Sequence, residues 1–137
     1  MYLTISYISN VSETLTQEGV ETVMMETKMN NNSLDIRGIL ICVDQTFFQI
    51  IEGECDSIRS LYKKIEEDDR HYNLIKILET KTEKRRYKRF NSNYITYNND
   101  SANIELIKFL ETNIEDMTDK KLHDLIVYQS KILLNRY

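Results

Sequence analysis

The chain has 137 residues, of which 41% are hydrophobic and 29% charged, values that fit one folded domain better than a disordered or membrane-embedded chain. The net charge of −4 argues against general nucleic-acid affinity, and no apolar run approaches the ~20 residues that span a bilayer. The N-terminus lacks a signal-peptide pattern, and the two cysteines lack metal-ligand spacing. We therefore interpret the cysteines as reduced thiols and expect a cytoplasmic protein with no membrane or nucleic-acid partner.

The first half of the chain predicts a strand, a helix and a hairpin. Residues 2–9 alternate apolar and polar side chains, which is the period of a half-buried strand. Ser12 offers a helix N-cap, and apolar side chains then recur at helical spacing until the polar cluster of residues 30–33. Two apolar runs, residues 34–43 and 47–52, flank turn-forming residues and predict a pair of central strands.

The second half begins with another amphipathic helix. Its apolar side chains follow Gly53 at positions i, i+3, i+4 and i+7 and stop at the acidic residues 66–69; they are Ile58, Leu61, Tyr62 and Ile65. Residues 74–78 and 94–97 predict two further strands. The basic run between them, residues 81–89, is most simply a solvent-exposed strand or loop.

The order βαββαββ predicts an α+β fold, with a ferredoxin-like sheet and both helices on one face. We expect residues 1–98 to form this domain. Residues 99–137 carry two more helical stripes, over 104–110 and 122–133. These predict a C-terminal helical extension that packs on the bare sheet face or at a subunit contact.

The sequence offers no conventional catalytic or metal motif. It has no nucleophile elbow, no phosphate-binding glycine loop and no zinc-type cluster, so we expect neither enzyme activity nor a metal site. Two polar side chains stand out instead: Gln49 shares a strand face with Phe47 and Ile51, and Tyr7 lies on the first strand. Each is also explained as an ordinary core residue whose polar group finds a partner within the protein.

Three segments of the chain resemble the BLUF family of flavin-binding blue-light sensors. They are residues 36–40 (IRGIL), 47–54 (FFQIIEGE) and 68–71 (DDRH). The similarity extends from the first strand to about Phe90. The spacing between its key positions matches the family without gaps; these positions are Tyr7, Asn31, Gln49 and His71.

The resemblance implies a flavin, FAD or FMN, that lies between the two helices on one face of the sheet, above Tyr7 and Gln49 on adjacent strands. In the family, the light-excited flavin takes an electron and a proton from the tyrosine. The glutamine amide then changes its hydrogen bonding to the flavin, which shifts the absorption to the red. Tyr7 would therefore be the donor, and Gln49 would be the switch, because an amide has both donor and acceptor faces.

The same resemblance implies further cofactor-binding positions. Those at the flavin ring are Asn31, Asn30, Val23 and Ile65, and those near the ribityl chain, pocket edge and phosphate are Lys64, Asp68, Arg70 and His71. The plain alternatives for these residues are helix termination, ordinary core packing and a solvated helix end.

The chain departs from the family pattern at the fifth strand. Phe90 and Ser92 stand where the family usually has tryptophan and methionine, and Arg37 replaces a small hydroxyl residue before Gly38. In the family this strand relays the signal to the C-terminal helices, so Phe90 and Ser92 are the expected relay positions and the output could be altered.

With no effector domain attached, we expect output through a homo-oligomer or a separate effector protein whose affinity differs between dark and lit states. The alternative is a light-insensitive protein-interaction module that kept the fold, motivated by Phe90 and Ser92. A third reading, an acylphosphatase-like enzyme, would need a glycine-rich phosphate loop that is not evident.

Overall fold

The computed structural model describes residues 1–96 and residue 108. Its elements are β1 (Tyr2–Val11), α1 (Gln17–Ser33), β2 (Arg37–Val43), β3 (Thr46–Glu54), α2 (Cys55–Glu67), β4 (His71–Thr82) and β5 (Phe90–Thr96). The predicted βαββαββ order and the α+β class are confirmed. The helices predicted within residues 99–137, and their place on the sheet, lie outside the described residues.

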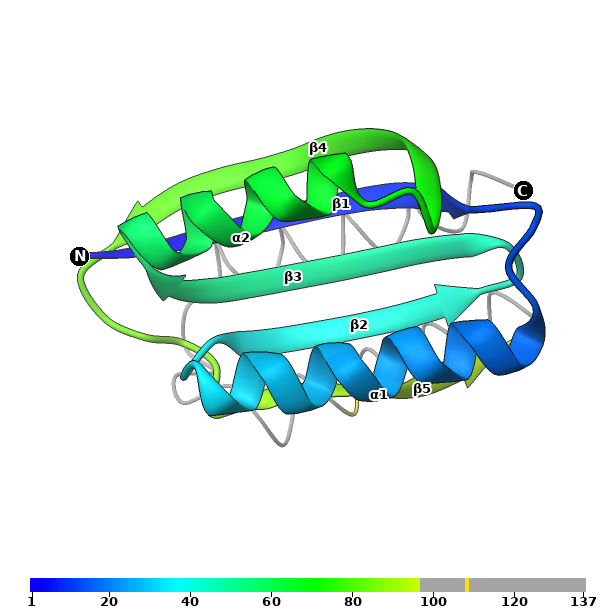
Figure 1. The fold of residues 1–137 in the computed structure, drawn as a ribbon. Helices are drawn as coiled ribbons and strands as arrows, with labels where there is room; N and C mark the ends of the chain where they lie inside the picture. Colours follow the sequence, from blue (N-terminus) through cyan, green and yellow to red (C-terminus); the bar gives the residue numbers. More distant parts are fainter. Residues whose placement is uncertain (97–107, 109–137) are drawn as a thin grey trace.

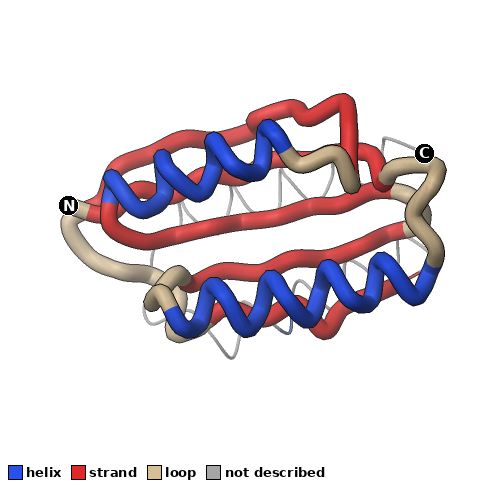
Figure 2. Tube along the Cα trace, in the orientation of Figure 1, coloured by secondary structure: helices blue, strands red, loops and turns tan. Residues whose placement is uncertain are grey.

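The strands form one sheet in the order β4-β1-β3-β2-β5. β1 pairs antiparallel with β3 and β4, β2 pairs antiparallel with β3, and β5 runs parallel to β2 at the edge. Both helices lie on the same face, as predicted: α2 packs on β1 and β3, and α1 packs on β2 and β5 (Figure 1). Figure 2 shows the same two layers. Within the described part of the chain, no helix is long and apolar enough to cross a bilayer.

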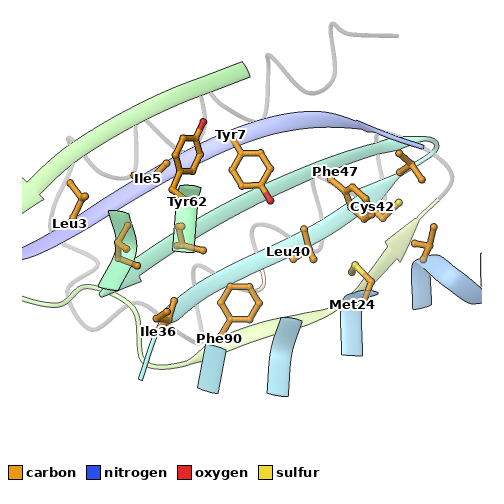
Figure 3. Close-up of a cluster of buried hydrophobic side chains, with 14 residues drawn as sticks. Leu3, Ile5, Tyr7, Met24, Ile36, Leu40, Cys42, Phe47, Tyr62 and Phe90 are labelled. Atoms are coloured by element: carbon orange, nitrogen blue, oxygen red, sulfur yellow. The ribbon is translucent and has the colours of Figure 1, made fainter. Parts of the chain in front are cut away.

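The core between the helices and the sheet is built from the inward positions of β1, β2 and β3, from the first residue of β5 and from both helices (Figure 3). Its members include Leu3, Ile5, Val20, Met24, Leu40, Phe47, Ile51, Ile58 and Phe90. The opposite face of the sheet carries a second set of buried apolar side chains, which are Ile8, Ile39, Ile41, Phe48 and Ile50. Because β2 and β3 are buried on both faces, they read as nearly continuous apolar runs, whereas β1 alternates and buries small polar side chains, Thr4 and Ser6, on its second face.

One glycine allows β2 to approach β3 closely. Gly38 has φ 137°, and a Cβ added there would lie 2.0 Å from the carbonyl oxygen of Ile50. No residue with a side chain fits this position without moving the backbone. The close approach holds the start of β2 against the middle of β3.

The boundaries of α1 differ from the prediction at both ends. The N-cap is Thr16, whose Oγ1 accepts a hydrogen bond from the Gly19 N–H at 3.0 Å, and the predicted cap Ser12 lies in a turn before the helix. At the other end, α1 continues through the predicted polar stop to Ser33. The chain turns at Asp35, where φ is 55°, a left-handed conformation that aspartate tolerates.

The two outer strands are longer than predicted. β4 covers His71–Thr82 rather than residues 74–78, because it pairs along nearly the whole length of β1. β5 begins at Phe90 rather than at residue 94, and Phe90 lies opposite Gly38 of β2. Long-range pairing therefore extends both strands into sequence that carries little strand signal of its own.

Candidate functional site

A cavity of about 240 Å³ opens between α1 and α2 on the helix-bearing face of the sheet. It is lined by every photoactive and cofactor-binding position named from the sequence, which are Tyr7, Val23, Asn30, Asn31, Gln49, Lys64, Ile65, Asp68, Arg70 and His71. The fold thus brings these side chains to one place, while their roles toward a ligand stay predictions. The expected relay residue Phe90 lies apart in the core with a fully buried side chain, and the side chain of Ser92 is outside the described part of the molecule.

The floor of the cavity holds a buried pair of polar side chains. Tyr7 on β1 lies directly opposite Gln49 on β3, and its hydroxyl donates a hydrogen bond to Oε1 of the glutamine. Both residues are buried, and burial is the main reason that the pKa of Tyr7 is raised far above its usual range. The phenol is therefore kept protonated, and Figure 3 shows its hydroxyl pointing from β1 toward β3.

Asn31 presents an unsatisfied group in the same cavity. Its side chain is 2% exposed, and its Nδ2 finds no hydrogen-bond partner among the described residues. Its backbone carbonyl is engaged, accepting from the Ile36 N–H at 2.8 Å. A buried amide without a partner costs free energy, so this nitrogen is better explained by a ligand than by the fold alone.

The walls of the cavity are apolar and its rim is charged. Val23 from α1 and Ile65 from α2 both line the space, and both belong to the margin of the hydrophobic core. Lys64 and Asn30 also line it and are exposed to solvent. The space therefore suits a flat apolar ring with polar edges, with a cation at the mouth for an anionic group.

Arg70 links the two sides of this mouth. Its guanidinium donates to Asp68 Oδ2 at 2.7 Å and to Glu26 Oε2, on α1, at 3.1 Å. The hydrogen bonds from Arg70 hold the pKa of Asp68 below its usual value. The network joins α1 to the segment that follows α2.

His71 is fixed by both of its ring nitrogens. Its Nε2 lies 2.6 Å from the Ile65 carbonyl oxygen, and its Nδ1 lies 2.7 Å from the Ser9 hydroxyl. Because a carbonyl only accepts, Nε2 carries the proton and Nδ1 accepts from Ser9 in the neutral ring. A free, solvated side chain, the plain alternative for His71, is therefore wrong: the ring fastens the end of α2 to β1 and packs edge-on against Tyr7.

Four further residues line the cavity that were not predicted as site residues. They are Thr27, Leu40, Phe47 and Leu61. Spacing would have found them: Thr27 lies one helical turn before Asn31, and Leu61 one turn before Ile65. Leu40 lies directly opposite Gln49 in the sheet.

A second polar cluster, on the other face of β3, was also missed. The fully buried carboxylate of Glu52 accepts hydrogen bonds from the backbone N–H groups of Arg86 and Tyr87, at 3.0 and 3.4 Å, and from Arg85 Nε at 3.4 Å. Arg85 also donates to the carbonyl oxygen of Asp35 at 2.7 Å, and its side chain is only 10% exposed. The interpretation of residues 81–89 as solvent-exposed is therefore wrong for Arg85 and for the buried Tyr87.

Known proteins resemble this chain in sequence and in fold. The profile of the family BLUF, "Sensors of blue-light using FAD", matches residues 2–93. The "Blue light- and temperature-regulated antirepressor BluF" of Escherichia coli is 30% identical over 78 residues, which cover 57% of this chain and 19% of that protein.

Among solved structures, "BlrP1 BLUF" has a TM-score of 0.70 at 22% identity and covers 92% of this chain and 87% of that one. "Klebsiella pneumoniae BlrP1 with FMN and cyclic diGMP, no metal ions" has a TM-score of 0.68 at 23% identity and covers 93% and 35%. At these identities the structures establish the likeness of fold. The chain spans about a fifth of the length of the E. coli relative.

Proposed function

This chain belongs to the BLUF family of blue-light sensors that use FAD, and we propose that it binds a flavin between α1 and α2 and responds to blue light through Tyr7 and Gln49. The observation that carries the proposal is the buried Tyr7–Gln49 hydrogen bond at the floor of a cavity that also holds the unsatisfied Asn31 amide. The family is one of sensors, which agrees with the expectation that this domain is not an enzyme.

The residues around the cavity fit a flavin by their chemistry. Asn31 Nδ2 supplies a donor for a ring acceptor, and Val23 and Ile65 supply apolar contacts to the faces of the ring. Lys64 and Arg70 supply positive charge at the mouth, which favours a phosphorylated flavin, FAD or FMN, over riboflavin. A bound flavin contributes the absorption of blue light and the capacity to accept an electron and a proton.

The protein's own part is to hold and release one proton at Tyr7. Burial keeps the phenol intact, and its hydrogen bond aims the proton at Gln49 Oε1. The Gln49 amide has a donor end and an acceptor end, so its rotation would exchange the groups directed at Tyr7 and at the cavity. Such an amide has two hydrogen-bonded states of similar shape, which is what a light-driven switch requires.

Output from the switch would pass through β5 to a partner. Phe90 and Ser92 are the proposed relay positions, since β5 is bonded to β2, which in turn pairs with the Gln49 strand. We infer that the partner is a second copy of this chain or a separate effector protein. The cytoplasmic location expected from the sequence stays a prediction.

The visible absorption spectrum of the purified protein, recorded in the dark and after blue illumination, tests the proposal. We expect a flavin spectrum with a reversible red shift that is abolished by Tyr7→Phe and by Gln49→Ala. Ser6→Ala, on the opposite face of β1, is the matched control and should keep the shift. Bound flavin without a shift would favour the light-insensitive interaction module, and failure to take up any flavin after reconstitution would refute the proposal.

A further inference from the structure

The first residue of β5, Phe90, which we call the head of the strand, is hydrogen-bonded to one side chain from α1. Asn32 Nδ2 donates to the Phe90 carbonyl oxygen at 3.0 Å, and the Phe90 N–H donates to Asn32 Oδ1, also at 3.0 Å. The carboxamide thus pairs with both backbone groups of Phe90, as a neighbouring strand would. On its other side, the head of β5 is held by a hydrogen bond from the Gly38 N–H to the Arg89 carbonyl oxygen at 3.0 Å.

Asn32 directly follows the residue that presents the unsatisfied amide to the cavity. Asn31 and Asn32 lie on the last turn of α1, where Asn31 points into the cavity and Asn32 points to β5. The Leu34 N–H, which caps this turn, lies within hydrogen-bond distance of the carbonyl oxygens of Asn30, Asn31 and Asn32. A ligand that engages Asn31 would therefore restrain the same turn that positions Asn32.

We propose that Asn32 couples occupancy of the cavity to the placement of β5. The inference rests on the proposed function, because the ligand is the flavin. Asn32 does not line the cavity, so it is a positioning residue rather than a binding residue. The coupling runs through α1 rather than through the Tyr7–Gln49 hydrogen bond, and it reaches the strand where this chain carries Phe90.

Coupling of this kind has a thermodynamic requirement. A ligand shifts a second element only if it binds differently to the states in which that element is placed and displaced. The two Asn32 hydrogen bonds provide that difference, because they form only when the last turn of α1 and the head of β5 are both in place. Removing them should leave the cavity intact and uncouple β5 from it.

Hydrogen exchange read by mass spectrometry in the dark, with and without FMN, tests the coupling. In the wild type, FMN should slow exchange of the backbone amides of Phe90–Thr96 by roughly tenfold, the size of an ordinary coupling energy. Asn32→Ala should bind FMN with nearly wild-type affinity and lose this slowing. Asn32→Asp, which keeps an acceptor for the Phe90 N–H but lacks the donor, should retain part of it.

Ser33→Ala is the matched control. Ser33 lies on the same turn, and its hydroxyl donates to the Asn30 carbonyl oxygen at 2.8 Å, within α1. This variant should show the wild-type slowing. The proposal is overturned if Asn32→Ala keeps the FMN-dependent slowing, or if Ser33→Ala loses it equally. A wild-type protein that takes up no FMN refutes the proposed function instead, and that outcome is recognised separately from the absorption spectrum.

Discussion

Gln49 and Glu52 lie on the same strand and face opposite sides of the sheet, and their polar groups have different hydrogen-bond partners. Glu52 receives backbone N–H groups and an arginine, so its carboxylate is surrounded by donors from one loop. Gln49 is hydrogen-bonded to Tyr7 in a cavity that Asn31 also lines, and the amide nitrogen of Asn31 finds no partner in the described residues. Both sites bury polar groups of β3. Of the two, only the cavity has a polar atom, Asn31 Nδ2, that still lacks a hydrogen-bond partner among the described residues.

The difference separates a structural polar cluster from the proposed flavin site. Burial raises the pKa of Glu52, and the hydrogen bonds from Arg86, Tyr87 and Arg85 act against that rise. Such a carboxylate is stabilised by the loop it holds. In the cavity, Asn31 Nδ2 has no hydrogen-bond partner among the described residues, and a ligand that supplied an acceptor for it would gain affinity.

The largest expected effect is at the structural cluster. Glu52→Ala takes from Arg85 one of its two carboxylates, while the ion pair with Asp35 at 2.9 Å remains, and it removes the buried acceptor of the Arg86 and Tyr87 N–H groups. The free energy of unfolding should therefore fall by about 3 kcal/mol. Urea unfolding measures it. The control is Glu54→Ala on the same strand, an exposed residue that makes no side-chain cap bond and should change stability by less than about 0.5 kcal/mol. If both variants changed the free energy of unfolding by equally small amounts, Glu52 would not be the centre of a structural cluster.

The binding side of the comparison is tested at Asn31. Asn31→Leu removes the unsatisfied amide from the ligand-free protein, so its stability should stay within about 1 kcal/mol of wild type or rise. Affinity for FMN, titrated by fluorescence quenching, should fall at least about tenfold. Asn30→Leu at the exposed rim should cost about threefold or less. A clear loss of stability in Asn31→Leu without loss of FMN affinity would show that Asn31 is a structural residue.

The Tyr62 hydroxyl, on the helix-bearing face of the sheet, allows the effect of burying a polar group near the cavity to be tested at high pH. Tyr62 packs edge-on against Tyr7, with ring centroids 6.0 Å apart, and burial raises its pKa from 10.0 to about 12. Because the folded-state pKa lies above the unfolded one, the stability due to Tyr62 is complete below pH 10 and is lost as the pH rises toward 12.

Tyr62→Phe should therefore match wild type near pH 7 and lose roughly 1 kcal/mol less stability than wild type near pH 12. Denaturant titrations at the two pH values measure the difference. Tyr72→Phe, at an exposed position on β4, should lose as much stability at high pH as the wild type. If Tyr62→Phe also matches the wild-type loss, ionisation of Tyr62 does not contribute to alkaline unfolding.

The lining of the cavity could be predicted from the sequence, and the structural cluster could not. Alternation placed Gln49 on the inward face of its strand, helical spacing placed Val23 and Ile65 among the apolar positions, and the family resemblance then singled these residues out as site positions. Glu52 and Arg85 are far apart in sequence, and only the closure of the chain between β4 and β5 brings them together. Their charges read equally well as solvent-facing residues, because composition does not reveal burial of an ion pair.

The predicted boundaries and N-cap of α1 were wrong for a related reason. Ser12 and Thr16 are both good N-cap residues, and the choice between them depends on contacts that the local sequence does not contain. Ser12 is held outside the helix by its backbone N–H, which donates to the Arg70 carbonyl oxygen at 2.9 Å. The pairing of Asn32 with Phe90 likewise crosses 58 positions of sequence. In each case a tertiary hydrogen bond decides between two locally acceptable structures.

The smallest expected effect concerns the charges at the mouth of the cavity. Glu26 accepts a hydrogen bond from Arg70 at 3.1 Å, and both side chains are substantially exposed, so the pair contributes little to stability and is open to competition. A flavin phosphate would compete with Glu26 for Arg70. Glu26→Gln should therefore tighten FMN binding about two- to fivefold and leave riboflavin binding unchanged, with the gain shrinking as salt is added. Glu21→Gln, also exposed on α1, is the control. An equal gain for riboflavin would mean that Glu26 acts on the cavity as a whole, and no gain for FMN would mean that Arg70 does not face the phosphate.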